Sequence, residues 1–303
     1  MQYTFTVSDE QNQDRIDKCI SSYYDDLSRS HVQRLIDDGA VLYNGKPCKA
    51  NTRVVPGGVV CIAVPEAILP SVEPENIALD ILYEDSDVIV VNKPKGMVVH
   101  PAAGHYSGTL VNALLYHCKD LSGINGYLRP GIVHRIDKNT TGSVIACKND
   151  FAHINIADQL KEHTINRHYY ALVHGSMKEK SGTVHAPIGR SSKDRKKMAV
   201  DEKNGKDAIT HFTVVNEYQG YTLLDLKLET GRTHQIRVHM AMIGHPVVGD
   251  DVYCSMKCPF KLEGQTLHAY LLGFHHPRTG EYIETKAELP DYFTALLSSL
   301  KPF

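Results

Sequence analysis

The sequence lacks the features of a membrane or secreted protein. Its apolar runs, such as Val88–Val91, are far shorter than the roughly 20 residues that a membrane-spanning helix needs. The N-terminal residues MQYTFTVSDE have neither the basic region nor the apolar core of a secretory signal. We therefore expect a cytoplasmic protein that has no membrane partner.

Cysteine pairs and metal-binding spacings are also missing. The seven cysteines are scattered from Cys19 to Cys258, and their odd number favours reduced thiols over a disulfide framework. Cys254 and Cys258 are separated by three residues rather than two, and the pair His275-His276 has no partner at a ligand spacing. The pattern predicts no bound metal.

The signatures of several enzyme classes are absent as well. The sequence contains no phosphate-binding P-loop, no GxGxxG between a strand and a helix, no HExxH and no GxSxG. It therefore gives no support to P-loop nucleotide hydrolysis, dinucleotide-dependent redox chemistry, zinc proteolysis or serine hydrolysis.

The net charge is small but unevenly distributed. A formal charge of −2 argues mildly against a nucleic-acid partner. Residues 189–206 nevertheless hold seven basic and three acidic side chains, which is a local excess of four positive charges. This segment is either a solvated surface loop or a contact for phosphate, and Lys196 and Lys197 are its candidates for the second role.

The chain is long enough for two domains of unequal size. Apolar residues at helical spacing predict helices over 14–24 and 28–39 near the N-terminus. Arg29 and Arg34 lie outside the apolar stripe of the second helix, so we expect them to be available to solvent or to phosphate. A hairpin at Asn44-Gly45 follows.

A proline-containing segment marks the domain boundary. Residues 65–76 hold three prolines and show no periodicity, which is typical of an extended linker. We predict a small α/β domain over 1–64, the linker over 65–76 and a larger domain over 77–303. In the larger domain, predicted strands follow one another in hairpin-like succession, which favours an α+β fold with a mostly antiparallel, mixed β-sheet flanked by helices and loops.

Three clusters contain residues suited to chemistry. The first, RPGIVHRIDKNTTGSVIACKND (129–150), places His134, Arg135 and Asp137 within four residues. An aspartate beside cationic neighbours stays an anion, which suits a nucleophile or an electrostatic stabiliser better than a general acid. A salt bridge that merely fixes the loop is the commoner outcome for such residues.

The second cluster is LETGRTHQIRVHMAMIGHPVVGD (228–250), in which Thr230 or Thr233 can cap a following helix. Cations crowd the first turns of that helix, among them Arg237. Because they oppose the helix dipole, they need an anion such as a phosphate or the carboxylate of Asp137. The alternative is a capped helix with solvated arginines.

The third cluster is INRHYYALVHG (165–175). If this segment is a strand, Tyr169 and Tyr170 point to opposite faces of it. One of them is then expected to pack in the core, while the other could stack on a base. Simple packing of both rings is the more ordinary interpretation.

Taken together, the clusters resemble the motifs of the RluA-type pseudouridine synthases. HRIDKNTTG (134–142) is similar to that family's HRLDxxTSG, and TGRTHQIRVH (230–239) is similar to TGRxHQIRxH. Arg167, Tyr169 and Ala171 resemble its basic-x-Tyr-x-Ala motif. Because three motifs occur in the family's order with matching connecting runs, chance agreement is improbable.

Residues 14–64 are similar to the alpha-L RNA-binding module, which is found on family members that modify large-subunit ribosomal RNA. The runs LVNALLYHC (110–118) and INGYLRPGIVHRID (124–137) resemble the RluD subgroup. The chain is therefore identified as a member of the RluA-type family with an N-terminal RNA-binding domain.

The resemblance implies that the protein isomerises uridine to pseudouridine in RNA, with large-subunit ribosomal RNA as the expected substrate. Asp137 would be the catalytic carboxylate, Arg237 its ionic partner, and Tyr169 the residue that stacks on the uracil. The expected substrate-binding residues are His134, Arg135, Leu228, Arg232, Lys196, Lys197, Arg29 and Arg34.

This isomerisation breaks the bond from N1 to C1′, turns the uracil ring and joins C5 to C1′. Nothing is oxidised or hydrolysed, so we expect neither a cofactor nor a metal. The expected partner is RNA, either free or in a ribosomal particle, and a monomer is favoured. The alternatives are a non-catalytic RNA-binding or ribosome-assembly factor and a base-excising glycosidase.

Overall fold

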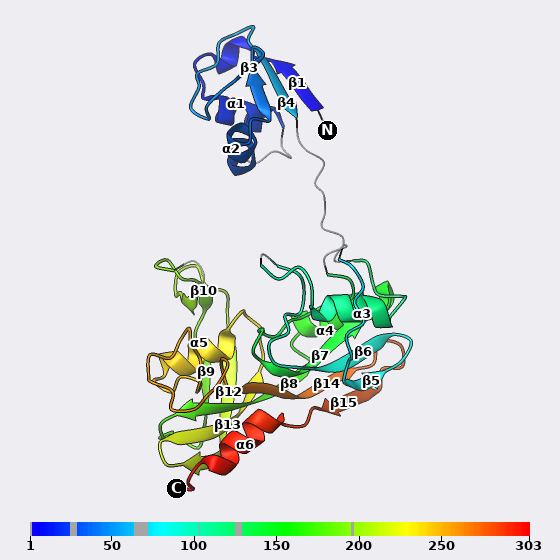
Figure 1. The fold of residues 1–303 in the computed structure, drawn as a ribbon, viewed down its shortest axis with the longest axis vertical. Coiled ribbons are helices and arrows are strands. Elements are labelled where there is room, and N and C mark those ends of the chain that lie inside the picture. Colours follow the sequence, from blue (N-terminus) through cyan, green and yellow to red (C-terminus); the bar gives the residue numbers. More distant parts are fainter. Residues whose placement is uncertain (1, 25–28, 64–71, 103, 125–128, 195–196) are drawn as a thin grey trace. The chain divides into compact units, whose positions relative to one another are not determined.

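The computed structural model describes residues 2–24, 29–63, 72–102, 104–124, 129–194 and 197–303. The chain divides into two compact units, Met1–Leu69 and Pro70–Phe303, and each is described by itself (Figure 1). Among the described residues, no helix combines the length and apolar character needed to cross a bilayer.

The N-terminal unit packs two helices against a four-stranded antiparallel sheet with strand order β1-β4-β2-β3. Apolar residues spaced three or four apart, such as Ile16 and Ile20, bury one stripe of each helix against the sheet. Its elements are β1 (Gln2–Thr6), a 3-10 turn (Asp9–Gln11), α1 (Ile16–Tyr23), α2 (Arg29–Asp37), β2 (Val41–Tyr43), β3 (Lys46–Pro47) and β4 (Val59–Ala63).

Most of this unit follows the sequence pattern. Both predicted helices form, and Asn44 and Gly45 have φ of 49° and 75°, as a tight hairpin turn requires. Strand β1, by contrast, was not predicted. Of the predicted linker, residues 65–71 lie outside the described residues. The next residues bind the larger unit, since the Gly108 N–H donates to the Glu75 carboxylate at 3.0 Å.

The larger unit contains a nine-stranded sheet with order β5-β6-β7-β14-β8-β13-β12-β9, and β15 also pairs with β14. Neighbouring strands are antiparallel except for β7 and β14, so the predicted mixed, mostly antiparallel α+β fold is confirmed. The strands are β5 (Ile81–Glu84), β6 (Val88–Lys93), β7 (Thr141–Cys147), β8 (Asn166–His174), β9 (Ser181–His185), β12 (Ile209–Tyr218), β13 (Tyr221–Leu228), β14 (Leu267–His275) and β15 (Tyr282–Lys286). A separate hairpin pairs β10 (Ile188–Arg190) with β11 (Met198–Val200).

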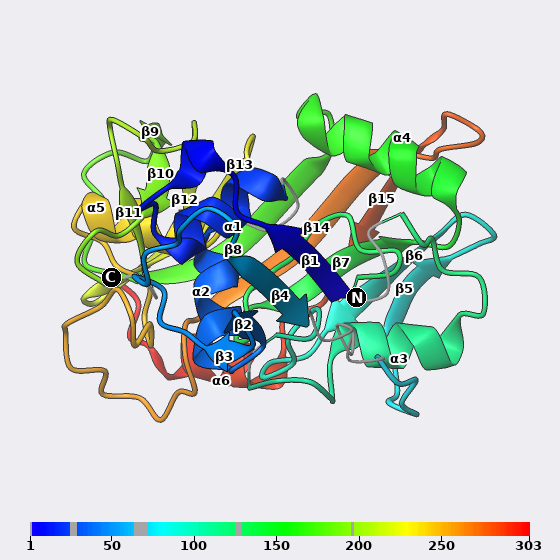
Figure 2. The same ribbon diagram turned by 90° about the horizontal axis from the view of Figure 1, so that it is seen from above.

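Helices cover both faces of this sheet. Helices α3 (Leu110–His117) and α5 (Gln235–Met242) pack on one face, whereas α4 (Asp150–Lys161) and α6 (Asp291–Ser299) pack on the other. Figure 2 shows α3 and α4 on opposite sides of the strands near β6 and β7. Successive residues of a strand point to opposite faces of the sheet and so pack into different cores. The face that packs against α3 and α5 carries the candidate site.

Strands β7 and β14 approach each other unusually closely at the centre of the sheet. Gly142 has φ of +107°, and a Cβ atom placed there would lie 2.2 Å from the backbone oxygen of Ala269. Only glycine fits this position. The approach fixes the start of β7, and Asp137 lies on the loop that leads into that strand.

Candidate active site

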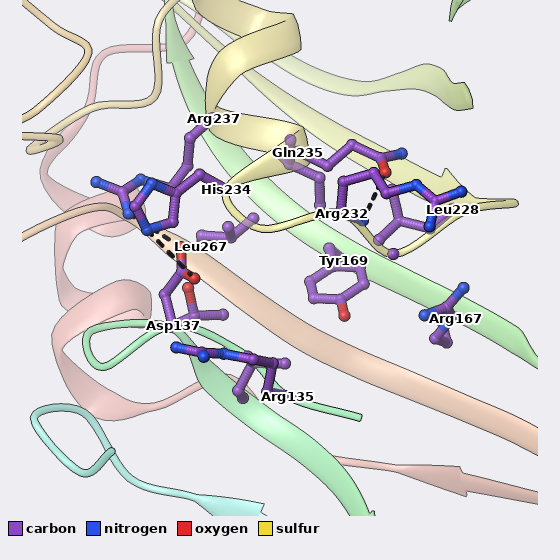
Figure 3. A pocket seen from close by; sticks show the side chains of 14 residues that line it. Arg135, Asp137, Arg167, Tyr169, Leu228, Arg232, His234, Gln235, Arg237 and Leu267 are labelled. Carbon is purple, nitrogen blue, oxygen red and sulfur yellow. Dashed lines mark hydrogen bonds and ion pairs between the residues drawn. The ribbon is translucent and has the colours of Figure 1, made fainter. Parts of the chain in front are cut away.

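An open pocket of about 430 Å³ lies on the face of the sheet that α5 covers (Figure 3). Its walls come from the loop before β7, from the first half of β8, from the end of β13 and from the turn into α5. Asp137, Tyr169, Leu228 and Arg237 all line it. The fold therefore brings together residues that are far apart in the sequence.

Asp137 and Arg237 form a direct ion pair. Arg237 Nη1 donates to Asp137 Oδ2 at 2.9 Å. Asp250 fixes the guanidinium from behind, because Arg237 Nε and Nη2 donate to its two carboxylate oxygens at 2.6 and 2.8 Å. The side chains of Arg237 and Asp250 are 5% and 0% exposed, while that of Asp137 is 16% exposed. Asp137 is thus the member of the trio that a ligand can reach.

The charges of this trio stabilise one another. Burial opposes the charge on Arg237, but hydrogen bonds and attraction from Asp250 and Asp137 outweigh burial and raise its pKa. For Asp250, burial alone would raise the pKa. The hydrogen bonds and the positive charge of Arg237 have the larger, opposite effect, so the pKa of Asp250 is lowered. One guanidinium is thereby shared by two carboxylates, so the trio itself carries one net negative charge.

The turn into α5 is held by Gln235 rather than by a threonine cap. The prediction that Thr230 or Thr233 caps the helix is wrong, because the helix follows His234, which makes no side-chain capping bond. Instead, Gln235 Oε1 accepts hydrogen bonds from Thr230 Oγ1 at 2.8 Å and from the Arg232 N–H at 3.0 Å. A buried glutamine therefore ties the Thr-Gly-Arg turn to the helix.

Tyr169 and Tyr170 occupy opposite faces of β8, as the strand pattern predicts. Tyr169 is buried and lines the pocket, and burial raises the pKa of its phenol. Tyr170 stacks on Tyr270 on the far face, with ring centroids 3.9 Å apart. Tyr169 is therefore the ring that a base entering the pocket would meet, and Figure 3 shows it beside Asp137.

A larger cationic groove of about 1470 Å³ adjoins the pocket and shares Arg135, Arg167 and Arg232 with it. Arg129 and Lys161 add two more cations, and no carboxylate lines the groove in the described part of the chain. Arg167 is buried, and its Nε finds no hydrogen-bond partner among the described residues. Uncompensated cations in a groove attract a polyanion.

Comparison with known proteins identifies the chain. Residues 87–242 match the RNA pseudouridylate synthase family, and residues 14–60 match the S4 domain. The chain is 52% identical over 300 residues to the RNA pseudouridine synthase YlyB of Bacillus subtilis, covering 99% of this chain and 98% of the relative. This chain belongs to the RNA pseudouridylate synthase family. It is accordingly an RNA pseudouridine synthase, an enzyme of the isomerase class.

Other relatives of the synthase agree with this assignment. The chain is 43% identical to the ribosomal large subunit pseudouridine synthase D of Zymomonas mobilis, with 97% of this chain and 96% of the relative covered. The human protein "RNA pseudouridylate synthase domain containing 1" has a TM-score of 0.61 and 27% identity, covering 76% of this chain and 90% of that one.

Several residues predicted to bind substrate have other partners in the synthase. Burial lowers the pKa of His134 to about 3, and its Nε2 accepts a hydrogen bond from the Ile145 N–H at 3.0 Å, so it anchors the loop that carries Asp137 to β7. Arg29 Nε donates to Asp17 Oδ2 at 3.1 Å, while its side chain stays 51% exposed. Lys197 Nζ donates to the Val252 oxygen at 3.0 Å.

The remaining predicted residues divide by location. Arg135 is exposed at the mouth shared by pocket and groove, and Arg232 lines both while its Nε donates to the Asp207 oxygen at 2.8 Å. Arg34 is exposed on α2, and Lys196 lies outside the described residues. Asp250, Gln235, Arg129 and Lys161 were missed. The signal for Asp250 is the run GHPVVGD, whose final carboxylate follows α5 closely enough to reach Arg237.

Proposed function

We propose that this synthase isomerises uridine in RNA with Asp137 as the catalytic carboxylate. The observation that carries the proposal is the pairing of Asp137 with Arg237 at the wall of an open pocket, where Arg237 holds one carboxylate oxygen and the Asp137 side chain stays partly exposed. A carboxylate held in this way can attack C1′ or remove a proton from the ribose. Either step loosens the bond between N1 and C1′.

The other pocket residues suit a base that has left its helix. A uridine within folded RNA must be flipped out of its stack, which costs a few kcal/mol of unstacking. Tyr169 would stack on the uracil, and Leu228 would close the apolar wall so that the detached ring cannot escape. The exposed Arg135 would enter the gap left in the RNA. The ring then turns and C5 joins C1′. This step releases Asp137 from C1′ if it attacked there, or returns the ribose proton if it removed one, while C5 loses its proton and N1 gains one.

We propose large-subunit ribosomal RNA as the substrate. The name of the Zymomonas mobilis relative specifies the ribosomal large subunit, and the S4 match supports a second unit that binds RNA. The cationic groove beside the pocket would hold the phosphates that flank the target uridine, without reading their sequence. Mapping pseudouridines in the ribosomal RNA of a strain that lacks the gene tests this substrate and identifies the position.

The catalytic role is tested with RNA that carries tritium at uridine C5. We expect the wild type to release tritium and Asp137→Asn to release none while still binding RNA. Asp120→Asn, an exposed aspartate outside the pocket, is the matched control and should keep wild-type activity. No release by the wild type would favour a non-catalytic RNA-binding factor. Free uracil with an abasic sugar would favour a glycosidase.

A further inference from the structure

Tyr253 and His234 connect Asp137 to the β10–β11 hairpin. The Met198 N–H on β11 donates to Tyr253 Oη at 2.9 Å. The same Oη lies 2.7 Å from His234 Nδ1, and the two rings meet edge-on with centroids 5.6 Å apart. On its other side, His234 Nε2 lies 3.7 Å from Asp137 Oδ1. Figure 3 shows His234 directed at Asp137.

The direction of these hydrogen bonds follows from their chemistry. A backbone N–H only donates, so Tyr253 Oη accepts from Met198. The phenol proton then needs an acceptor, and His234 Nδ1 is the one within reach among the described residues. A neutral imidazole that accepts at Nδ1 carries its proton on Nε2. That Nε2–H faces Asp137.

Two further observations concern the charge and the backbone conformation of His234. Burial lowers the pKa of His234, and the nearby Arg237 and Arg135 add to this shift, although Asp137 and Asp250 oppose it. His234 also adopts the left-handed conformation, with φ of 57° and ψ of 19°. This conformation is unfavourable for most residues that bear a Cβ, and at His234 it accompanies a ring placed between Tyr253 and Asp137.

We propose that His234 and Tyr253 are positioning residues for Asp137, an inference that rests on the proposed role of Asp137. Arg237 holds Oδ2 with a full hydrogen bond, whereas His234 directs Oδ1 across 3.7 Å without bonding to it. Oδ1 therefore keeps its lone pairs and is the oxygen that acts on the ribose. The contact from Met198 through Tyr253 makes the hairpin the outer support of this arrangement.

The tautomer can be observed directly in the resting enzyme. Long-range ¹H–¹⁵N correlation spectra of the wild type report which ring nitrogen of each histidine carries the proton, and the signals lost in His234→Gln assign this residue. We expect His234 to be neutral at pH 7 with the proton on Nε2. A proton on Nδ1, or a charged ring, overturns the proposal. This measurement does not depend on whether the enzyme acts on any particular RNA.

Kinetics separate a positioning role from a structural one. Misplacing a reacting group by about 1 Å can cost on the order of 10²-fold in rate. We expect Tyr253→Phe and His234→Ala to lower kcat by roughly 10- to 100-fold with KM within about twofold of the wild type. His234→Gln keeps an amide N–H near the place of Nε2 and should recover part of the loss.

The matched control is Tyr83→Phe, which removes a phenol that donates to Asp85 at 2.7 Å outside the pocket. It should keep wild-type kcat. If Tyr253→Phe and Tyr83→Phe have equal kcat at equal melting temperature, the proposal fails. An inactive wild type would instead refute the proposed function, and the tautomer measurement would still report on the contact between Tyr253 and His234.

Discussion

Asp250 is the most deeply buried acid of the site, and its carboxylate accepts four hydrogen bonds. Two come from Arg237, and the others come from the N–H groups of Val252 and Tyr253 at 2.9 and 3.1 Å. It therefore orients both the guanidinium that pairs with Asp137 and the turn that carries Tyr253. Removing it leaves a buried, half-paired arginine, which is a costly defect.

We expect Asp250→Ala to lower the free energy of unfolding by about 3–5 kcal/mol, the usual cost of removing one partner of a buried ion pair. Asp251→Ala, which replaces the exposed neighbour, should change it by less than about 0.5 kcal/mol. Denaturant titration of both variants measures the difference. Similar stability for the two would show that Arg237 does not depend on Asp250.

Lys93 is a second unusual residue near Asp137. It is fully buried, and its Nζ donates to the backbone oxygens of Pro94, Met97 and Lys138 at 2.9, 2.8 and 3.1 Å. Burial lowers the pKa of Lys93 to about 7, although the charge of Asp137 opposes this shift. The side chain thereby ties β6 to the loop that carries Asp137.

This shift predicts a pH dependence. An unfolded lysine titrates near about 10.4, so between pH 7 and 10 the unfolded chain binds more protons than the folded protein. The contribution of Lys93 to stability therefore rises across this window and is lost as pH falls through 7. Between pH 7 and 9, the free energy of unfolding of the wild type should gain roughly 2–3 kcal/mol relative to Lys93→Met. A constant difference would show that the three carbonyls keep Lys93 charged.

The sequence predicts the reactive residues of the site better than their supports. Asp137 and Arg237 lie in motifs whose spacing is visible in one dimension, and the structure pairs them. Lys93 depends on burial and on a backbone carbonyl from another segment, which no local pattern encodes, and the sequence signal for Asp250 is limited to the end of the run GHPVVGD. The ion pair of Arg29 with Asp17 was not foreseen for a related reason, because Asp17 lies on the preceding helix.

Among the elements, the pairing of β7 with β14 positions the loop that carries Asp137. It is parallel and includes Thr141 with His268 and Gly142 with Ala269. Gly142 combines a positive φ with a close backbone approach. Gly220 has a positive φ of +83° as well, but no atom lies within 4 Å of the position that a Cβ would occupy there. Substitution of Gly220 therefore measures the free-energy cost of a positive φ alone. Substitution of Gly142 adds the cost of the steric contact with Ala269.

We expect Gly220→Ala to destabilise the protein by about 1–2 kcal/mol, the cost of placing an L-residue in this region. Gly142→Ala should cost roughly 1–3 kcal/mol more because β14 must move away. Thermal or denaturant unfolding of the two variants gives the comparison. Equal losses would mean that the sheet accommodates a methyl group between β7 and β14.

Elements were predictable where their pattern was local. The helices of the small unit show a clear apolar stripe, and Asn44-Gly45 marks its own turn. Strand β14 is buried on both faces through most of its length and lacks the polar alternation of an exposed strand. Strands β10 and β11 have three residues each, and their packing against Val238 and Tyr253 has no local signature.

For the whole molecule, the distribution of charge matters more than its sum. The chain carries a formal charge of −2, yet five arginine and lysine side chains line the groove beside the pocket. Binding of RNA through these cations releases counterions, so its strength must decrease with salt. Net charge alone was a misleading guide to the partner of this protein.

We expect the affinity for a labelled single-stranded oligouridylate to fall linearly with salt on logarithmic axes, with each phosphate contact contributing a slope of about −0.7. Replacing both Arg129 and Lys161 by alanine should make the slope shallower by roughly 1.4. Replacing Lys119 and Lys178, which lie outside the groove, should leave it unchanged. Fluorescence anisotropy at several salt concentrations measures all three proteins, and identical slopes would exclude the groove from the contact.

The same parallel pairing of β7 with β14 also has a consequence for biosynthesis. The sheet of the larger unit cannot pair β7 with β14 until Ala269 has been synthesised. The N-terminal unit, by contrast, is complete at Leu69, two hundred residues earlier. At roughly 5–20 residues per second, a translating ribosome needs about 10–40 s to cover that interval. During this time the nascent chain presents a finished nucleic-acid-binding unit followed by an unassembled enzyme, and premature termination anywhere within it yields a binder that cannot catalyse.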